Sequence, residues 1–208
     1  MKKFLPIFIL LAALITSCEP VYKAANFQET ANTHRVIAVL PPKVIIEIKS
    51  AKEAEAILKQ QIIESERFQN ALVSYLNQHH TQNKIFIQTQ NAEETNKILA
   101  DNNINSLTGR SYKELATILG VDAVVSSRVS LAKPLTNSEA FFTSLLTGYS
   151  APSKITTVDL SLTDKATGKM FWNYNWEDGG TFISAEKLTN SLMKAAAIRF
   201  PYKTKDLK

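Results

Sequence analysis

The chain has 208 residues, of which 45% are apolar and 21% charged, and its formal net charge at pH 7 is +5. This length and apolar content suit a single globular domain and exclude a fibrous or wholly disordered chain. The excess positive charge is spread along the sequence, which is not typical of nucleic-acid binding. A single cysteine excludes an internal disulfide, and one cysteine with three histidines cannot make a four-ligand structural zinc site without carboxylate ligands. No cofactor is predicted.

The first 18 residues have the pattern of an export leader. Lys2 and Lys3 precede an apolar run over 4–15, which is shorter than the roughly 20 residues that a helix needs to span a bilayer. Small residues then precede Cys18 directly. The predicted signal-peptidase site consists of the last three residues before this cysteine: Ile15, Thr16 and Ser17.

This leader resembles the lipobox of bacterial lipoproteins, in which the cysteine thiol receives a diacylglyceryl group and the freed amine is acylated. The resemblance implies fatty acyl chains, palmitate among them, on Cys18, and several chains on one residue give a lasting membrane anchor. The alternatives are an ordinary secretory signal with a coincidental cysteine, or a leader that is retained as an anchor. Glu19 rather than Asp follows Cys18, which by family analogy implies the outer membrane. The favoured hypothesis places the protein on the periplasmic face of that membrane, and the sequence leaves the cell exterior open.

The sequence predicts four segments. Residues 1–17 form the signal peptide, and residues 18–34 comprise the lipidated cysteine and a flexible tether, because 19–34 show no helical or strand periodicity. Residues 35–200 form the folded domain, and 201–208 form a basic tail.

The first half of the domain begins with a strand over 36–40, which is apolar throughout, ends at two prolines and is typical of a strand buried on both faces. A short strand or a loop follows over 44–48. Capping patterns at Ser50, Asn91 and Ser111 predict helices over 50–79, 91–101 and 111–119, with Gly120 ending the last of them. A strand over 84–89 lies between the first two helices. The first helix carries one apolar stripe that includes Leu58, Ile62, Phe68, Leu72 and Leu76.

The second half contains three strands, over 121–129, 155–163 and 170–176. An insert over 133–153 separates the first two, and a hairpin loop over 164–169, with Gly168 at positive φ, joins the last two. A final helix begins at Ser184 and runs to Ile198. The order β-α-β-α-α-β-(insert)-β-β-α predicts an α/β (α+β) fold with a single mixed sheet and helices packed on it.

Three local patterns carry a resemblance to a known periplasmic domain. They are RVIAVLPP over 35–42, LATILGVDAVVSSRV over 115–129 and LTDKATGKMFW over 162–172. In this order they resemble the α/β domain shared by the CsgG-type curli export lipoprotein, the LpoB-type activator of cell-wall synthases and the TolB amino-terminal domain. The insert over 133–153 departs from the CsgG-type channel, because its 21 residues include two prolines and do not alternate as a membrane hairpin does.

Two groups of apolar residues are candidate binding sites. Those in the insert have the spacing of a short amphipathic helix, which either folds back on the sheet or contacts a protein partner or a membrane. Its residues are Phe141, Phe142, Leu145, Leu146 and Tyr149. An aromatic stripe on the last strand is either part of the core or a platform for a sugar or peptide. It consists of Trp172, Tyr174 and Trp176.

No constellation of residues predicts catalysis. His79 and His80 are adjacent and therefore do not form the i, i+4 pair of a helical metal site. Asp122 and Asp159 lie within predicted strands and are interpreted as hydrogen-bonded or edge carboxylates. No Ser-His-Asp grouping or phosphate-binding loop is present in the sequence. The protein is therefore predicted not to be an enzyme.

Together these features predict a lipoprotein that is tethered to the envelope by Cys18. The favoured hypothesis is a non-enzymatic adaptor or accessory of an envelope assembly for cell-wall synthesis, secretion or transport, with an envelope protein as its partner. The alternative is an oligomeric component of a CsgG-like export channel in the outer membrane. Neither hypothesis involves nucleic acid or a metal.

Overall fold

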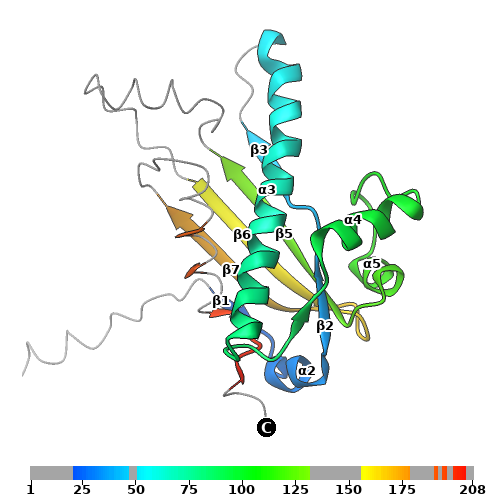
Figure 1. Cartoon of the computed structure of the whole chain (residues 1–208), viewed down its shortest axis with the longest axis vertical. Coiled ribbons are helices and arrows are strands. Elements are labelled where there is room, and N and C mark those ends of the chain that lie inside the picture. The colour runs from blue at the N-terminus through cyan, green and yellow to red at the C-terminus, as the bar shows by residue number, and fades with distance from the viewer. Residues whose placement is uncertain are drawn as a thin grey trace, which may run out of the picture.

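A computed structural model describes residues 21–46, 51–131, 156–178, 190–191, 194–195 and 199–204. Over these residues, seven strands form one mixed sheet in the order β1-β7-β6-β5-β2-β4, and β3 pairs with β5 beside this path (Figure 1). The predicted α/β class, with a single mixed sheet and helices packed on it, is confirmed. The strands are β1 Val21–Lys23, β2 Val36–Val39, β3 Lys43–Ile46, β4 Gln88–Thr89, β5 Ala123–Leu131, β6 Thr156–Asp164 and β7 Met170–Asp178. The helices are α2 Phe27–Thr33, the short 3-10 helix η2 Ala51–Glu53, α3 Ala54–Thr81, α4 Ala92–Asp101 and α5 Tyr112–Leu119.

β2 lies at the centre of the parallel part of the sheet, between β4 and β5. Its alternate residues are buried in two different clusters. Ile37 and Val39 belong to the cluster beneath α3, whereas Ala38 and Leu40 belong to the cluster formed with α4 and α5. Helices therefore cover both faces of β2, as its uninterrupted apolar sequence predicts.

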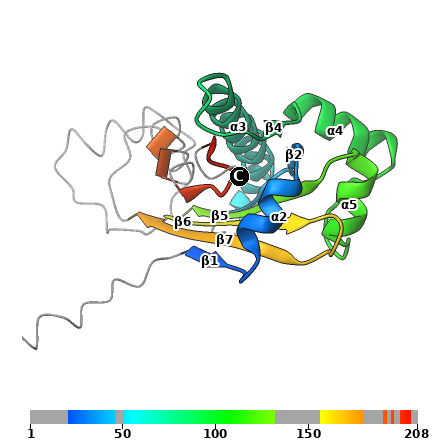
Figure 2. The ribbon, with the colours of Figure 1, turned by 90° about the horizontal axis from the view of Figure 1, so that it is seen from below.

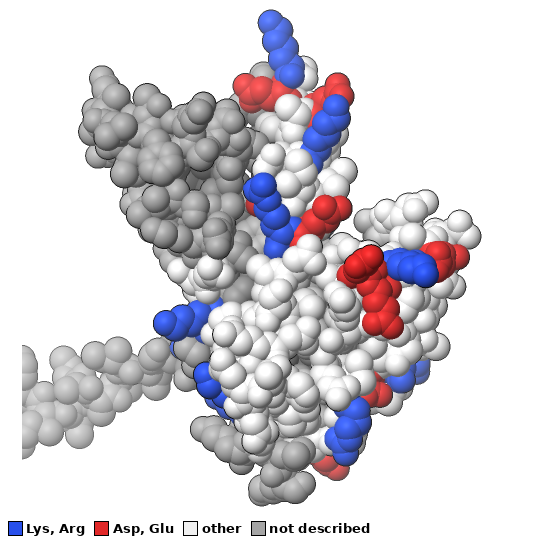
Figure 3. All heavy atoms as spheres, viewed as in Figure 1, with Lys and Arg blue, Asp and Glu red and all other residues white. Residues whose placement is uncertain are grey.

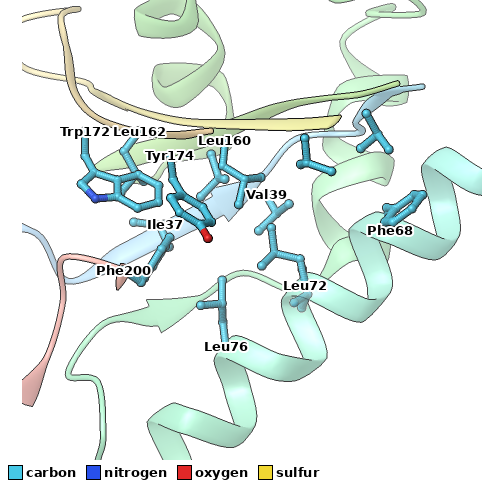
Figure 4. Close-up of a cluster of buried hydrophobic side chains, with 14 of the residues drawn as sticks. Ile37, Val39, Phe68, Leu72, Leu76, Leu160, Leu162, Trp172, Tyr174 and Phe200 are labelled. Atoms are coloured by element: carbon cyan, nitrogen blue, oxygen red, sulfur yellow. The ribbon is translucent and has the colours of Figure 1, made fainter. Parts of the chain in front are cut away.

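The larger cluster fills the space between α3 and the antiparallel strands β6 and β7 (Figure 4). Figure 2 shows α3 lying across one side of the sheet. Every second residue of β6 and β7 points toward this helix, because side chains alternate between the faces of a strand. The buried members drawn in Figure 4 include Leu72 and Leu76 from α3, Leu160 and Leu162 from β6, Trp172 and Tyr174 from β7, and Phe200.

Two glycines end elements where the sequence predicts them. Gly120 follows α5 with φ of 70°, and Gly168 closes the β6–β7 hairpin with φ of 70°. A Cβ at Gly168 would also lie 3.3 Å from the Lys113 side chain. Both positions therefore favour glycine, since other residues rarely adopt this backbone conformation.

The flexible tether predicted over 18–34 is wrong from residue 21 onward. β1 pairs antiparallel with β7, so that Val21 lies opposite Tyr174 and Lys23 opposite Trp172. α2 then leads into β2. A three-residue strand and a seven-residue helix are too short to show a period, and tertiary packing of a few apolar residues holds them instead.

The basic tail predicted over 201–208 is also wrong for its first four residues. Tyr202 is fully buried, and the backbone N–H of Phe86 donates to its carbonyl oxygen at 3.0 Å. Lys203 bridges to Ile85, and the N–H of Thr204 donates to the carbonyl of Lys84. Phe200 and Tyr202 supply the apolar contacts that keep this basic segment on the domain.

Several boundaries also differ from the prediction. The strand expected over 84–89 is reduced to β4, and α3 begins at Ala54 after the 3-10 turn rather than at residue 50. Asn91 and Ser111 occupy the expected N-cap positions, but neither side chain makes the capping hydrogen bond. The insert over 133–153 lies outside the described residues. The described residues of the predicted last helix are helical: Asn190, Ser191, Lys194 and Ala195.

Candidate interaction surface

Polar side chains fasten the middle of α3 to the parallel strands. Gln61 accepts a hydrogen bond from the backbone N–H of Ile46 at 3.0 Å, and the Ser65 hydroxyl donates to the carbonyl of Pro42 at 2.7 Å. One turn further, the buried Gln69 donates to the carbonyl of Val39 at 2.8 Å. These bonds satisfy strand-end backbone groups that would otherwise be unpaired, and they fix the direction in which α3 leaves the sheet.

The first turns of α3 carry three large apolar side chains that are exposed. Leu58 is 53% exposed, Ile62 63% and Ile63 43%, and we call these three residues the α3 tip. Figure 1 shows these turns extending beyond the sheet. The predicted apolar stripe is therefore buried at Phe68, Leu72 and Leu76 but exposed at Leu58 and Ile62. Covering a side chain of this kind is worth roughly 1.5–3 kcal/mol, so the α3 tip has the character of a contact surface.

Charged side chains flank the α3 tip. Lys59 pairs with Glu55 one turn earlier at 2.8 Å, and Arg67 pairs with Glu64 at 3.1 Å. Figure 3 shows Lys and Arg atoms interspersed with Asp and Glu atoms along this helix, with uncharged residues between them. Apolar residues surrounded by charges of both signs are typical of a protein contact rather than of a membrane-inserting helix.

Glu64 is a buried carboxylate in the same part of α3. Its Oε1 accepts hydrogen bonds from Gln60 at 2.5 Å and from Arg67 at 3.1 Å. Its Oε2 is buried and has no hydrogen-bond partner within the described parts of the chain. An unsatisfied buried acceptor costs about 1–3 kcal/mol.

A buried polar cluster at the other end of the sheet joins three segments that are distant in sequence. His34, which follows α2, lies with Nδ1 2.7 Å from the Tyr202 hydroxyl and with Nε2 3.0 Å from Oδ1 of Asp164. The other oxygen of Asp164 accepts from the backbone N–H and the hydroxyl of Thr167 at 2.7 and 2.6 Å. A His34 ring protonated on Nε2 donates to Asp164 and accepts from Tyr202, which satisfies all three groups.

The ionisation of this cluster follows from its burial and its hydrogen bonds. Burial opposes the charged form of Asp164, but the hydrogen bonds from Thr167 and His34 outweigh it and hold the pKa of this carboxyl below its ordinary value. Burial, together with the negative charges of Asp164 and Asp122, raises the pKa of Tyr202 well above its ordinary value. Tyr202 is therefore a neutral hydroxyl that donates a hydrogen bond, and Asp164 is an anion.

The composition of this cluster is that of a proton relay, but its position is not that of an active site. His34, Asp164 and Tyr202 are all buried, so a substrate could not reach the imidazole or the hydroxyl in this conformation. The cluster instead fixes the hairpin and the two chain ends to one another. Sequence reasoning missed it because His34 was assigned to the tether and Tyr202 to the tail.

Asp122 lies directly before β5 rather than in a strand, and Asp159 lies in β6. Both are hydrogen-bonded carboxylates, which is one of the two interpretations predicted for them from sequence. Oδ2 of Asp122 accepts the backbone N–H groups of Arg35 and Val36 at 2.7 and 3.0 Å. Burial alone would raise the pKa of Asp122, but these bonds and the charge of Lys165 lower it. Asp159 accepts two hydrogen bonds from the Asn173 amide, both at 3.1 Å.

Of the sequence-predicted binding residues, the structure places only the aromatic stripe. Trp172 and Tyr174 are buried in the core, with ring centroids 6.1 Å apart, and Trp176 packs against that core. Their burial leaves no open platform on Trp172 or Tyr174. The remaining predicted site residues lie outside the described residues: Ile15, Thr16, Ser17, Cys18, Phe141, Phe142, Leu145, Leu146 and Tyr149.

The described residues form neither a metal site nor a membrane-spanning helix. Three or more His, Cys, Asp or Glu side chains do not come together there as a metal site. Within the same residues, none of the helices combines the length and the apolar character needed to cross a bilayer.

Comparisons with known proteins report similarity of structure but not of sequence. No protein-family model matches the chain, and no curated protein matches it. The lipoprotein GNA1162 from Neisseria meningitidis matches 79% of this chain and 96% of its own, at 17% identity and a TM-score of 0.44. The PelC dodecamer from Paraburkholderia phytofirmans matches 82% of this chain and 87% of its own, at 12% identity and a TM-score of 0.41. The LpoB C-terminal domain from Salmonella enterica matches 73% of this chain and 93% of its own, at 13% identity and a TM-score of 0.37. At TM-scores below 0.5, these matches assign no function to this chain.

Proposed function

We propose that the protein is a lipid-anchored accessory protein of the bacterial envelope that acts by binding a protein partner rather than by catalysis. The leader carries this proposal: two lysines, an apolar run too short to span a bilayer, and small residues directly before Cys18. Acyl chains on Cys18 would confine the domain to a membrane surface and raise its effective concentration toward a partner in the same membrane.

The α3 tip supports the binding part of the proposal. Ile62 is the most exposed large apolar residue of the described chain, and it lies on a helix that projects from the sheet. A partner that covered Leu58, Ile62 and Ile63 would gain the free energy of apolar burial without distorting the core. The burial of His34, Asp164 and Tyr202 supports the non-enzymatic part, because the group of side chains with the most catalytic composition is sealed from substrate.

The anchor is tested by a Cys18→Ala substitution in the full chain. Wild-type protein is expected to incorporate labelled palmitate and to yield an N-terminal peptide that begins at residue 18 with diacylglyceryl and acyl mass. The variant is expected to lose both, because the thiol that carries the lipid is gone. Ser17→Ala is the matched control, since another small residue before the cysteine preserves the cleavage pattern. A free thiol on wild-type Cys18 would refute the anchor.

The contact surface is tested by Ile62→Glu. This variant is expected to change the free energy of unfolding by less than about 0.5 kcal/mol, because the side chain is mostly in solvent. It is also expected to abolish the crosslink between the anchored protein and its partner in membranes. Leu72 lies on the same helix but is buried in the core. Leu72→Glu should therefore strongly destabilise the domain, as measured by urea unfolding. Strong destabilisation by Ile62→Glu would show that the α3 tip is structural.

The alternative of an oligomeric export-channel component stays a prediction. An intact-assembly mass of the detergent-purified protein would test it, since a closed ring would favour the channel and a monomer the accessory protein.

A further inference from the structure

The first described residues of the chain are fixed to the domain rather than free. Val21 pairs with Tyr174 and Lys23 with Trp172, and the backbone N–H of Ala24 donates to the carbonyl of Phe171 at 2.9 Å. Val21 also packs against the hydrophobic core. The chain therefore enters the domain at a defined place, which is the outer strand of the sheet beside β7.

Very little chain separates this strand from the proposed lipid anchor. Two residues lie between Cys18 and Val21. Three residue steps span at most about 11 Å when fully extended, whereas the tether expected from sequence would have spanned about 55 Å. Lipidation of Cys18 would thus hold β1 within about 11 Å of the bilayer surface, and the domain could turn only about this edge.

The chemistry of the same edge suits a bilayer surface. Tyr22 is 51% exposed and Met170 is 44% exposed, and Lys23 and Lys169 beside them are also exposed. Tyr22 of β1 pairs with Asn173 of β7, and Asn173 pairs with Ser161 of β6. Met170 of β7 pairs with Thr163, which is two residues after Ser161 on β6. Tyr22 and Met170 therefore point to the same face of the sheet, because paired residues, and residues two apart on one strand, share a face.

We infer that the β1 edge, defined as Tyr22, Lys23, Lys169 and Met170, lies against the surface of the lipid bilayer. Tyrosine rings favour the headgroup region, and lysine stems lie along apolar surface while their ammonium groups reach lipid phosphates. Lys23 points to the opposite face from Tyr22, where its Nζ lies 5.0 Å from the centroid of the Phe27 ring, so it would meet lipid from the other side of this outer strand. The inference deepens the proposed function and rests on its lipid anchor. In Figure 1 the first turns of α3 lie at the top of the molecule and β1 lies in its lower half, so this orientation leaves the α3 tip free for a protein partner.

The test measures which side of the anchored domain meets lipid. The lipidated protein is prepared with one engineered cysteine, Tyr22→Cys or Met170→Cys, and labelled with an environment-sensitive fluorophore. The Cys18 thiol carries lipid, so the engineered thiol is the reactive one. Leu58→Cys on α3 and Tyr112→Cys on α5 are matched controls, because both side chains are large, apolar and exposed. Each protein is reconstituted into phosphatidylethanolamine–phosphatidylglycerol vesicles that contain a nitroxide lipid.

Quenching by the nitroxide lipid is expected to be at least about threefold greater for labels at 22 and 170 than for labels at 58 and 112, since only the β1 edge would reach the interface. Equal quenching at all four positions, or greater quenching at 58 or 112, would overturn the inference while leaving the anchor intact. Protein that does not float with the vesicles at all would overturn the anchor, and with it this inference. Thermal unfolding of each labelled protein confirms that the domain is folded.

Discussion

A Tyr202→Ala variant is expected to lose about 4 kcal/mol of its free energy of unfolding. The ring is fully buried, and it meets Phe86 and Phe200 with centroid separations of 5.6 and 5.4 Å. Its removal leaves a cavity beneath α3 and also leaves His34 Nδ1 without its hydrogen-bond partner. Urea unfolding followed by circular dichroism measures the loss.

The matched variant Tyr202→Phe separates packing from hydrogen bonding. It keeps the ring and removes only the hydroxyl, so the expected loss is about 1–3 kcal/mol. If Tyr202→Ala were no more destabilising than Tyr202→Phe, the ring would contribute nothing beyond its hydroxyl. The residues from 200 to 204 would then be the solvated tail that their basic composition suggests.

The contrast between this segment and β2 shows which parts of the fold could be predicted from sequence. The apolar run over 36–40 admits one interpretation, since five consecutive apolar residues can be satisfied only by burial on both faces. The hairpin is equally clear, because Gly168 is placed where the chain must adopt positive φ. Phe200 and Tyr202 lie among basic residues with no period around them, and only tertiary contacts decide that they are core.

The candidate sites could be predicted less well. The spacing of Leu58 and Ile62 continues the stripe of Phe68 and Leu72. Periodicity does not show at which residue a helix begins to extend beyond the sheet that it covers. The separation of 130 positions between His34 and Asp164 explains why their contact was missed, since no local pattern links them. Burial of His34 could have been suspected only from the position of this residue two places before the first central strand.

The buried cluster would have a mechanical consequence for the proposed lipid anchor. His34 holds the end of α2 to the β6–β7 hairpin through Asp164 and to the C-terminal segment through Tyr202. The N-terminal segment is therefore secured at both ends, by β1 pairing with β7 and by His34. A force applied to Cys18 through the proposed lipid would be transmitted to the whole sheet rather than taken up by a flexible segment. A fixed orientation of the domain at the bilayer requires this rigid connection.

An Asp164→Asn variant is expected to lose about 2–4 kcal/mol at pH 7, because a buried charged acceptor of hydrogen bonds from His34 and Thr167 is replaced by a neutral amide. The folded state holds the pKa of Asp164 below its ordinary value, which is about 3.9 in an unfolded chain. The ionised carboxylate therefore contributes stability that is fully present above that pH and is lost as the pH falls through the lower, folded-state pKa. The stability difference between wild type and variant should accordingly be constant from pH 7 to about 5 and shrink below about pH 4.

Urea unfolding of both proteins between pH 3 and 7 measures this difference. Wild-type stability also depends on Asp122, whose pKa is likewise lowered, so the variant should retain part of its acid sensitivity rather than become independent of pH. Asp101→Asn, at the exposed end of α4, is the matched control and should follow the wild-type curve. A difference that grew on acidification would mean that the folded state favours the protonated form of Asp164. The hydrogen bonds from Thr167 and His34 would then not be what holds the hairpin to the chain ends.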